Sequence, residues 1–142
     1  MIRAIISAAK ETHVRALVLQ LYGTGNVPSI KRDLRDMLGE AIEGGTLVVA
    51  NTQCHVGHVM MGHYATGRAL VEAGVVSAND MTVEAISCKL AYLFGRNDLS
   101  QIEVGDLMGV SLRGEITHSN SLPPPPLSSA YQRASRKGRR YF

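Results

Sequence analysis

A glycine-rich loop, Gly23-Thr24-Gly25-Asn26, follows the nearly continuous apolar run of residues 15–22. Its two glycines allow backbone N–H groups to approach a ligand closely, and the threonine hydroxyl and asparagine amide suit a small polar molecule. Pro28 stands where a dinucleotide-binding fingerprint requires its third glycine, and no Gly-Lys-Ser/Thr of a Walker loop follows. The loop therefore indicates either a small-molecule site or an ordinary strand-to-helix turn.

A second polar run, Asn51-Thr52-Gln53-Cys54, comes at the end of the next β-branched stretch. If both stretches are parallel strands, the two polar runs leave the same edge of the sheet and face one another. Two such loops would form a pocket for a small polar ligand. The same run is equally compatible with a loop whose buried thiol behaves as a small hydrophobic group.

Cys54, His55, His58 and His63 place one thiol and three imidazoles within ten residues, a combination that can bind zinc. Their spacing matches no standard structural zinc pattern, and no second cysteine is nearby. We therefore expect a histidine-rich exposed loop and no metal site.

Alternating helical and extended patterns must position these loops, and they predict an α/β domain with a mainly parallel sheet. The expected strands are residues 15–22, covered on both faces, and residues 46–51. The expected helices are residues 2–12, 29–43, 64–73, a helix from Met81 or Thr82 to near Gly95, and 100–108. The expected N-caps are Ser29, Asp80 and Ser100. The expected buried positions include Ile2, Ile5, Ile6 and Ala9; Leu34, Met37, Leu38 and Ala41; Ile86, Leu90 and Leu93; and Ile102, Val104 and Leu107.

The chain has 142 residues, enough for one domain, and its net charge of +3 comes from the C-terminal end. Residues 131–142 carry five basic side chains and no acidic one, after a run of four prolines from Pro123 to Pro126. We expect a folded domain over residues 1–117 and a disordered tail over 118–142. Without a nucleic-acid module, a signal peptide or an apolar run of about 18 residues, the sequence predicts a cytoplasmic protein that binds neither nucleic acid nor membrane.

Three stretches resemble the C-terminal domain of cytosolic (type I) L-asparaginases, over Ala16 to Thr117. They are LVLQLYGTGNVP, the run from TLVVANTQC to AYLFG, and DLMGVSLRGEIT. The most specific parts are TQC, YATGRAL, AGVVS, DMTVEA and LRGEIT. The resemblance implies a small three-layer α/β/α domain from an enzyme that hydrolyses L-asparagine to L-aspartate and ammonia without a metal or organic cofactor. It also implies a homo-oligomer, either a dimer or a tetramer, with the active site at a subunit interface.

In this family a separate N-terminal domain supplies the nucleophilic threonine and the groups that activate it. None of the threonines here, Thr24, Thr52, Thr66, Thr82 and Thr117, stands in that sequence context. We therefore assign no catalytic residue to this chain. We expect a fragment that completes the intersubunit site and the dimer but is inactive without the catalytic domain.

The resemblance also suggests two sets of site residues. Gly23, Thr24, Gly25 and Asn26 match the loop that reaches the neighbouring subunit's substrate. A second, effector site in some type I enzymes suggests Gln20, Asn26, Thr52 and Cys54 as candidates. Gln20 replaces an arginine there, which removes a bidentate contact to the effector's carboxylate.

Two other functions stay open. One is a stand-alone binding or regulatory module, which pairs with a full-length asparaginase or binds L-asparagine. The other is lysophospholipid hydrolysis, for which the sequence offers no serine elbow and no acyl-chain groove. A domain of this kind without its neighbours is also expected to expose an apolar surface.

Overall fold

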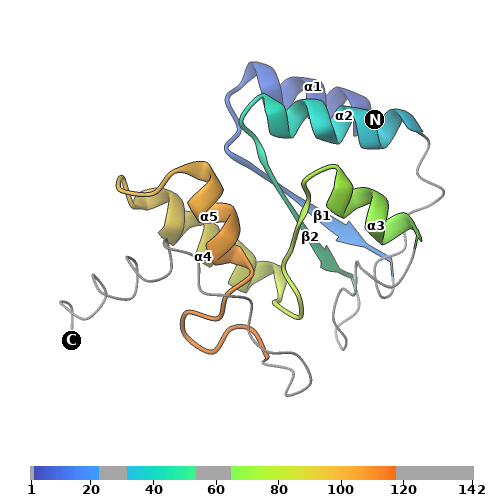
Figure 1. Cartoon of the computed structure of the whole chain (residues 1–142). Helices are drawn as coiled ribbons and strands as arrows, with labels where there is room; N and C mark the ends of the chain where they lie inside the picture. Colours follow the sequence, from blue (N-terminus) through green and yellow to red (C-terminus); the bar gives the residue numbers. More distant parts are fainter. Residues whose placement is uncertain (1, 23–31, 54–64, 118–142) are drawn as a thin grey trace.

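The computed structural model describes residues 2–22, 32–53 and 65–117 (Figure 1). The glycine loop, the Ser29 cap, Cys54 with the three histidines, and the tail after Thr117 lie outside these residues. The elements in chain order are α1 (Ile2–Glu11), β1 (Ala16–Leu21), α2 (Arg32–Glu43), β2 (Leu47–Thr52), α3 (Ala65–Glu72), β3 (Val76–Ser77), α4 (Val83–Gly95) and α5 (Gln101–Met108).

The strands form a parallel sheet in the order β1-β2-β3, as the alternating pattern predicts. All six residues of the central strand β2 are buried, whereas those of β1 are mostly half-buried. β1 is an edge strand of the described sheet, yet both of its faces pack against helices, as predicted: Ala16 and Val18 pack on the side of α4 and α5, and Leu17, Leu19 and Leu21 on the side of α1, α2 and α3. The short strand β3 was not expected, since two valines carry too little pattern to predict a strand.

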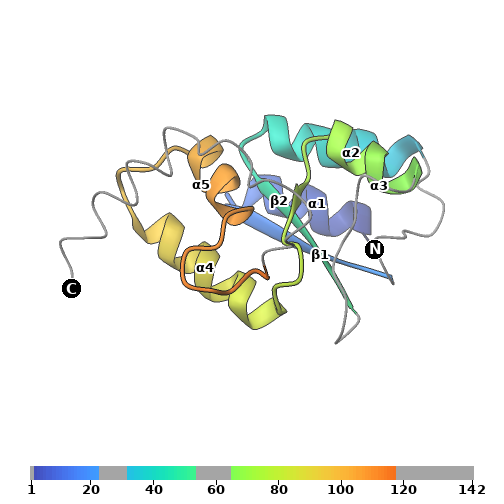
Figure 2. The ribbon, with the colours of Figure 1, turned by 60° about the horizontal axis from the view of Figure 1, so that its bottom comes forward.

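Helices cover the sheet from both sides and give the three layers implied by the resemblance (Figures 1 and 2). One core lies between the sheet and α1, α2 and α3, and it includes Ile6, Leu38 and Leu70. The other lies between the sheet and α4 and α5, and it includes Ile86 and Leu107. Each large aliphatic side chain buried in these cores stabilises the fold by about 1.5–3 kcal/mol.

The same turn joins each of the first three helices to the strand that follows it. One residue near each helix end has a positive φ: His13 at 54°, Gly45 at 91° and Gly74 at 90°. The next backbone N–H then bonds to a carbonyl five residues back, in the pairs Val14 to Ala9, Thr46 to Ala41 and Val75 to Leu70, at 2.9–3.0 Å. This is the Schellman arrangement, which satisfies the last carbonyls of a helix. The chain therefore repeats one helix–turn–strand unit three times.

Two of the expected N-caps can be examined. Ser100 caps α5 as predicted, with a capping box in which the Ser100 hydroxyl accepts from the Glu103 N–H and the Glu103 carboxylate accepts from the Ser100 N–H at 2.8 Å. Asp80 does not cap α4. The cap is Thr82, whose hydroxyl accepts the Ala85 N–H at 3.2 Å, because the helix begins later, at Val83.

Two predicted core residues are exposed instead. Ile5 is 53% exposed and Ile102 is 79% exposed. The buried side of α5 is formed by Val104, Gly105, Leu107 and Met108, so Ile102 lies on its outer face. In α1, Ile6 and Ala9 are buried. Among the helices described, none is long and apolar enough to cross a membrane.

Candidate functional site

The carboxyl ends of β1 and β2 lie side by side at one edge of the sheet. In the parallel register Gln20 is opposite Asn51, and Leu21 is opposite Thr52. The ends of β1 and β2, which precede the glycine loop and begin the TQC loop in the sequence, therefore lie next to each other. In parallel α/β sheets this edge is where ligands bind.

Gln53, which follows β2, is joined to the end of β1 by two hydrogen bonds. Its backbone N–H donates to the Leu21 carbonyl at 2.9 Å, and its side-chain Nε2 donates to the Gln20 carbonyl at 3.3 Å. The Gln20 side chain is exposed beyond these contacts. The edge thus presents an exposed amide held on a fixed backbone.

Asn51, at the end of β2, is a buried polar residue whose side-chain oxygen has no described hydrogen-bond partner. It is only 2% exposed, and its Oδ1 has no hydrogen-bond partner within the described ranges 2–22, 32–53 and 65–117. Buried polar atoms are almost always paired, so an unpaired acceptor of this kind calls for an explanation. Asn51 belongs to the polar run that the sequence predicts as a site, but no feature of that run indicates its burial.

Successive strand residues point to opposite faces of the sheet, which separates the predicted effector residues. Gln20 and Asn51 lie in register on the α4–α5 face, whereas Thr52 lies on the face of α1, α2 and α3. Asn26 and Cys54 lie outside the described residues, as does the whole Gly23–Asn26 loop.

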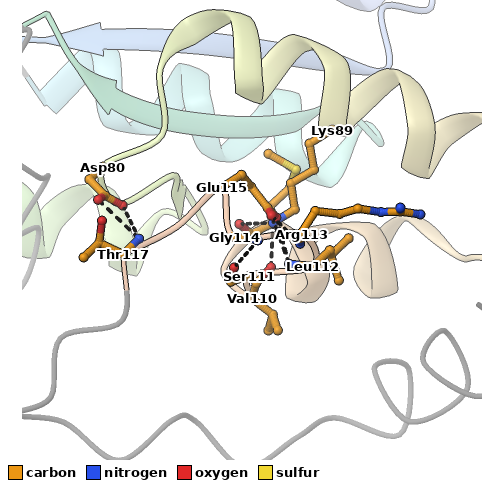
Figure 3. Close-up of polar contacts among 10 residues, drawn as sticks. Asp80, Lys89, Val110, Ser111, Leu112, Arg113, Gly114, Glu115 and Thr117 are labelled. Atoms are coloured by element: carbon orange, nitrogen blue, oxygen red, sulfur yellow. Dashed lines mark hydrogen bonds and ion pairs between the residues drawn. The ribbon is translucent and has the colours of Figure 1, made fainter.

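The end of β3 brings the C-terminal part of the domain to the same edge. The Asp80 carboxylate accepts the backbone N–H of Thr117 at 3.0 and 3.3 Å (Figure 3). Asn79, between Ser77 and Asp80, has a positive φ of 55°, and its N–H donates to the Ser77 hydroxyl at 3.1 Å. Residue 117 is thereby fixed beside the carboxyl end of the sheet.

A second set of contacts fixes the rest of the segment from Gly109 to Thr117 (Figure 3). The Lys89 ammonium on α4 lies 2.7 Å from Glu115 Oε1 and donates to the carbonyls of Met108, at 3.3 Å, and Val110, at 2.6 Å. Glu115 in turn accepts the N–H groups of Leu112 and Arg113, at 2.7–3.1 Å. We call these contacts the Lys89–Glu115 clamp.

The two charges of the clamp have shifted pKa values. Burial lowers the pKa of Lys89, and the hydrogen bond and charge of Glu115 oppose this shift. Burial alone would raise the pKa of Glu115, but its bonds from Lys89 and from the backbone of Leu112 and Arg113 lower it to about 2. These groups are saturated with partners, so they serve structure rather than proton transfer.

The described part of the chain offers other polar surfaces, but none with an evident catalytic arrangement. A groove of about 400 Å³ between α2 and α3 is lined by Asp36, Glu40, Glu43, Glu72 and Arg35, with Gly39 and Ala73. It lies near the helix ends that lead into β2 and β3, at the amino edge of the sheet. Within the described ranges no three His, Cys, Asp or Glu side chains are grouped to hold a metal ion.

Comparison with known proteins identifies relatives of this domain. The family model "Glutaminase/Asparaginase C-terminal domain" matches residues 1–108. L-asparaginase 1 of Escherichia coli is 48% identical over 104 residues, which are 73% of this chain and 30% of that protein. The human 60 kDa lysophospholipase is 39% identical over 114 residues, which are 80% of this chain and 20% of that protein.

The fold agrees with a solved relative. The crystal structure of L-asparaginase I from Vibrio cholerae superposes with a TM-score of 0.74 at 45% identity, covering 82% of this chain and 34% of that one. The chain therefore spans about a third or less of the length of each of these relatives.

Proposed function

Because the chain belongs to the glutaminase/asparaginase C-terminal domain family, we propose that it acts as the C-terminal domain of an L-asparaginase. The enzyme adds water across the side-chain amide of L-asparagine, breaks the C–N bond, and releases L-aspartate and ammonia. The observation that supports the proposal is the parallel pairing of the β1 and β2 ends, with Leu21 opposite Thr52, because ligands bind at this edge of parallel α/β sheets.

In this proposal the chain shapes the site and another domain performs the chemistry. A threonine hydroxyl needs a neighbouring base to become a nucleophile, and we assign both groups to an N-terminal catalytic domain. We assign the substrate contact to Gly23–Asn26, which follow β1 in the sequence, and Gln53 joins the ends of β1 and β2. The reaction needs no metal or organic cofactor.

A complementation assay tests this function. The 142-residue chain is co-expressed with E. coli L-asparaginase 1 from which the matched C-terminal region has been removed. We expect ammonia release from L-asparagine by the pair and none by either part alone. Asn26→Ala should reduce kcat/KM of the pair, whereas Asn97→Ala, at an exposed position between α4 and α5, serves as the matched control. A purified 1:1 complex without activity would overturn the proposal.

We further propose that the working protein is a cytoplasmic homo-oligomer, a dimer or a tetramer, built with the catalytic domain. Exposed apolar side chains on both helical layers, Ile5 and Val71 on one and Tyr92 on the other, support contacts with neighbouring domains. Size-exclusion chromatography with light scattering on the complemented pair should give a mass of at least two copies. A pair that stays a 1:1 heterodimer at micromolar concentration would contradict it.

A second candidate function is binding of L-asparagine as an effector, for which the sequence suggests Gln20, Asn26, Thr52 and Cys54. Because Thr52 lies on the other face of the sheet, the contact that the geometry favours is Gln20. The unpaired Asn51 Oδ1 beside the exposed Gln20 favours it, because a carboxamide N–H₂ could satisfy that acceptor. Calorimetry should then detect L-asparagine but not L-aspartate, which lacks this donor. Asn51→Leu should abolish the heat signal without lowering the melting temperature; unchanged binding by Asn51→Leu would reject this role.

A further inference from the structure

The groove of about 400 Å³ between α2 and α3 is negatively charged. Its lining includes four exposed carboxylates and one guanidinium, those of Asp36, Glu40, Glu43, Glu72 and Arg35. The Nε of Arg35 lies 3.6 Å from Oδ1 of Asp36, its neighbour on α2. The lining residues thus carry a net charge of −3, and four of the twelve acidic residues of the chain gather there.

Three of these carboxylates stand at helix ends that disfavour acidic groups. Glu40 and Glu43 lie in the last turn of α2, and Glu72 is the last residue of α3. The C-terminal end of a helix is the negative end of its dipole, so carboxylates there are destabilising and cations are stabilising. Neither of these two described helices has a basic residue in its last turn. A cationic partner in the groove would therefore stabilise both helix ends as well as the side chains.

Gly39 leaves space within this groove. It lies inside α2, where a glycine is less favourable than an alanine, and it is absent from the positive-φ glycines, so no special backbone conformation requires it. A Cβ placed on Gly39 would meet no atom of the described residues within 4 Å, so crowding does not require a glycine either. What the missing side chain provides is room in the groove, beside the carboxylates.

The chain contains a segment of complementary charge. Five basic side chains and no acidic one stand within residues 133–140, which we call the basic segment: Arg133, Arg136, Lys137, Arg139 and Arg140. Residues 1–130 hold the other ten basic residues and all twelve acidic residues, a net charge of −2. The basic segment and the groove therefore concentrate opposite charges of the same chain.

The basic segment is close enough in the sequence to reach the groove. Thr117 is held by Asp80, three residues beyond the end of β3, whereas the groove lies at the opposite, amino edge of the sheet. Strands of six residues make a sheet about 20 Å long, and a helical layer adds about 10 Å. Residues 118–132 can span up to about 50 Å when extended, which exceeds this path.

We propose that the groove between α2 and α3 binds the basic segment of the same chain. Guanidinium groups pair with Glu43 and Glu72 and complement the two helix ends, because an arginine can form two parallel hydrogen bonds with one carboxylate. A single exposed ion pair contributes little, but five basic groups facing one groove act together. The contact lies at the amino edge of the sheet, away from the ends of β1 and β2.

NMR spectra of the full 142-residue chain test this contact. In one variant the five basic residues of the segment are replaced by glutamine. The backbone amides of Gly39, Glu43 and Ala73 should then shift at least about three times as far as those of Ser87 and Ile102, because at 0.1 M salt charge effects extend only about 10 Å. Equal shifts at the groove and at these exposed positions of α4 and α5 would overturn the proposal.

A pair of charge variants provides the matched control. Glu43→Gln with Glu72→Gln removes two carboxylates of the groove, and in this background the glutamine substitutions in the basic segment should no longer shift Gly39 and Ala73. Glu11→Gln with Asp106→Asn removes two exposed carboxylates outside the groove and should preserve the full response. The same response in both backgrounds would contradict the assignment to this groove.

Gly39→Leu separates the shape of the groove from its charge. It keeps every carboxylate, and the open space at Gly39 accepts the new side chain without disturbing the fold, which circular dichroism checks. It should abolish the shifts of Glu43 and Ala73 that depend on the basic segment. Persistent shifts would reject the groove as the binding site, and shifts that fade on dilution would assign it to the segment of a second copy. Asparagine hydrolysis enters none of these readouts, so the result is independent of the proposed function.

Discussion

The Nζ of Lys89 lies 2.7 Å from Oε1 of Glu115, across 26 residues of sequence, and both side chains are largely buried. Their pairing connects the middle of α4 to the segment after α5 (Figure 3). Because Lys89 also binds the carbonyls of Met108 and Val110, this one ammonium group satisfies three acceptors. The end of the domain is therefore held by charge as well as by apolar packing.

Removing one partner of the clamp should be strongly destabilising. Lys89→Ala leaves the Glu115 carboxylate buried without its cation, and we expect a loss of about 3 kcal/mol in the free energy of unfolding. Urea denaturation followed by circular dichroism measures the loss. The control is Arg96→Ala, which removes the more exposed pair with Asp98, at 3.0 Å, and should cost at most about 1 kcal/mol. Equal losses for the two variants would contradict this reading of the clamp.

The clamp also predicts sensitivity to acid. The pKa of Glu115 falls from 4.5 to about 2 in the folded state, so the unfolded chain binds the proton more tightly. Ionised Glu115 thus contributes its full stabilisation above about pH 4.5, and this is lost as the pH falls toward about 2. At about 1.4 kcal/mol per pKa unit, this shift corresponds to about 3 kcal/mol. Glu115→Gln should flatten the dependence of unfolding free energy on pH in this window; an unchanged slope would assign acid sensitivity to other carboxylates.

His13 is the non-glycine member of the three helix–strand turns. Its φ of 54° is strained for a residue with a Cβ, although histidine tolerates it better than most. His13→Gly relieves the strain but makes the unfolded chain more flexible, so we expect a gain of at most about 1 kcal/mol. Gly74→Ala, at a φ of 90°, should instead lose about 1 kcal/mol or more. Thermal unfolding of both variants checks this, and a stabilised Gly74→Ala would contradict it.

The capping box of α5 gives a prediction for a single hydroxyl. Ser100→Ala removes the acceptor of the Glu103 N–H and should cost about 1 kcal/mol. Ser100→Asp restores an acceptor and should recover most of the stability. The measurement is the midpoint of urea unfolding, and equal midpoints for the two variants would show that the Ser100 cap contributes little.

The order of helices and strands was predictable because it depends on local patterns. The stripe of Leu38 and Ala41 in α2 and the Ser100 cap follow from spacing within one element. The structure differs from the sequence-based predictions where contacts between residues far apart in the sequence determine the role of a side chain. Asp80 resembles a helix cap in sequence, yet it accepts the N–H of Thr117, 37 residues away.

The candidate site was only partly predictable. Parallel pairing brings the end of β1 beside the end of β2, as strand order implies, whereas Gly23–Asn26 lie outside the described residues. The burial of Asn51 and the Lys89–Glu115 clamp depend on how α4 and the terminal segment pack, and no periodicity reports such packing. A lysine within a largely apolar helix, as in SCKLAYL, is the signal that could have suggested a buried partner.

The hydrogen bond between Asp80 and Thr117 also determines where any fused group is delivered. A group attached directly after residue 117 starts from Asp80, three residues beyond the end of β3. A short flexible tether holds its cargo at an effective concentration of about a millimolar. A ligand analogue or a reporter dye joined directly after Thr117 would stay near the end of β3, even if its affinity for that surface in free solution were too weak to measure.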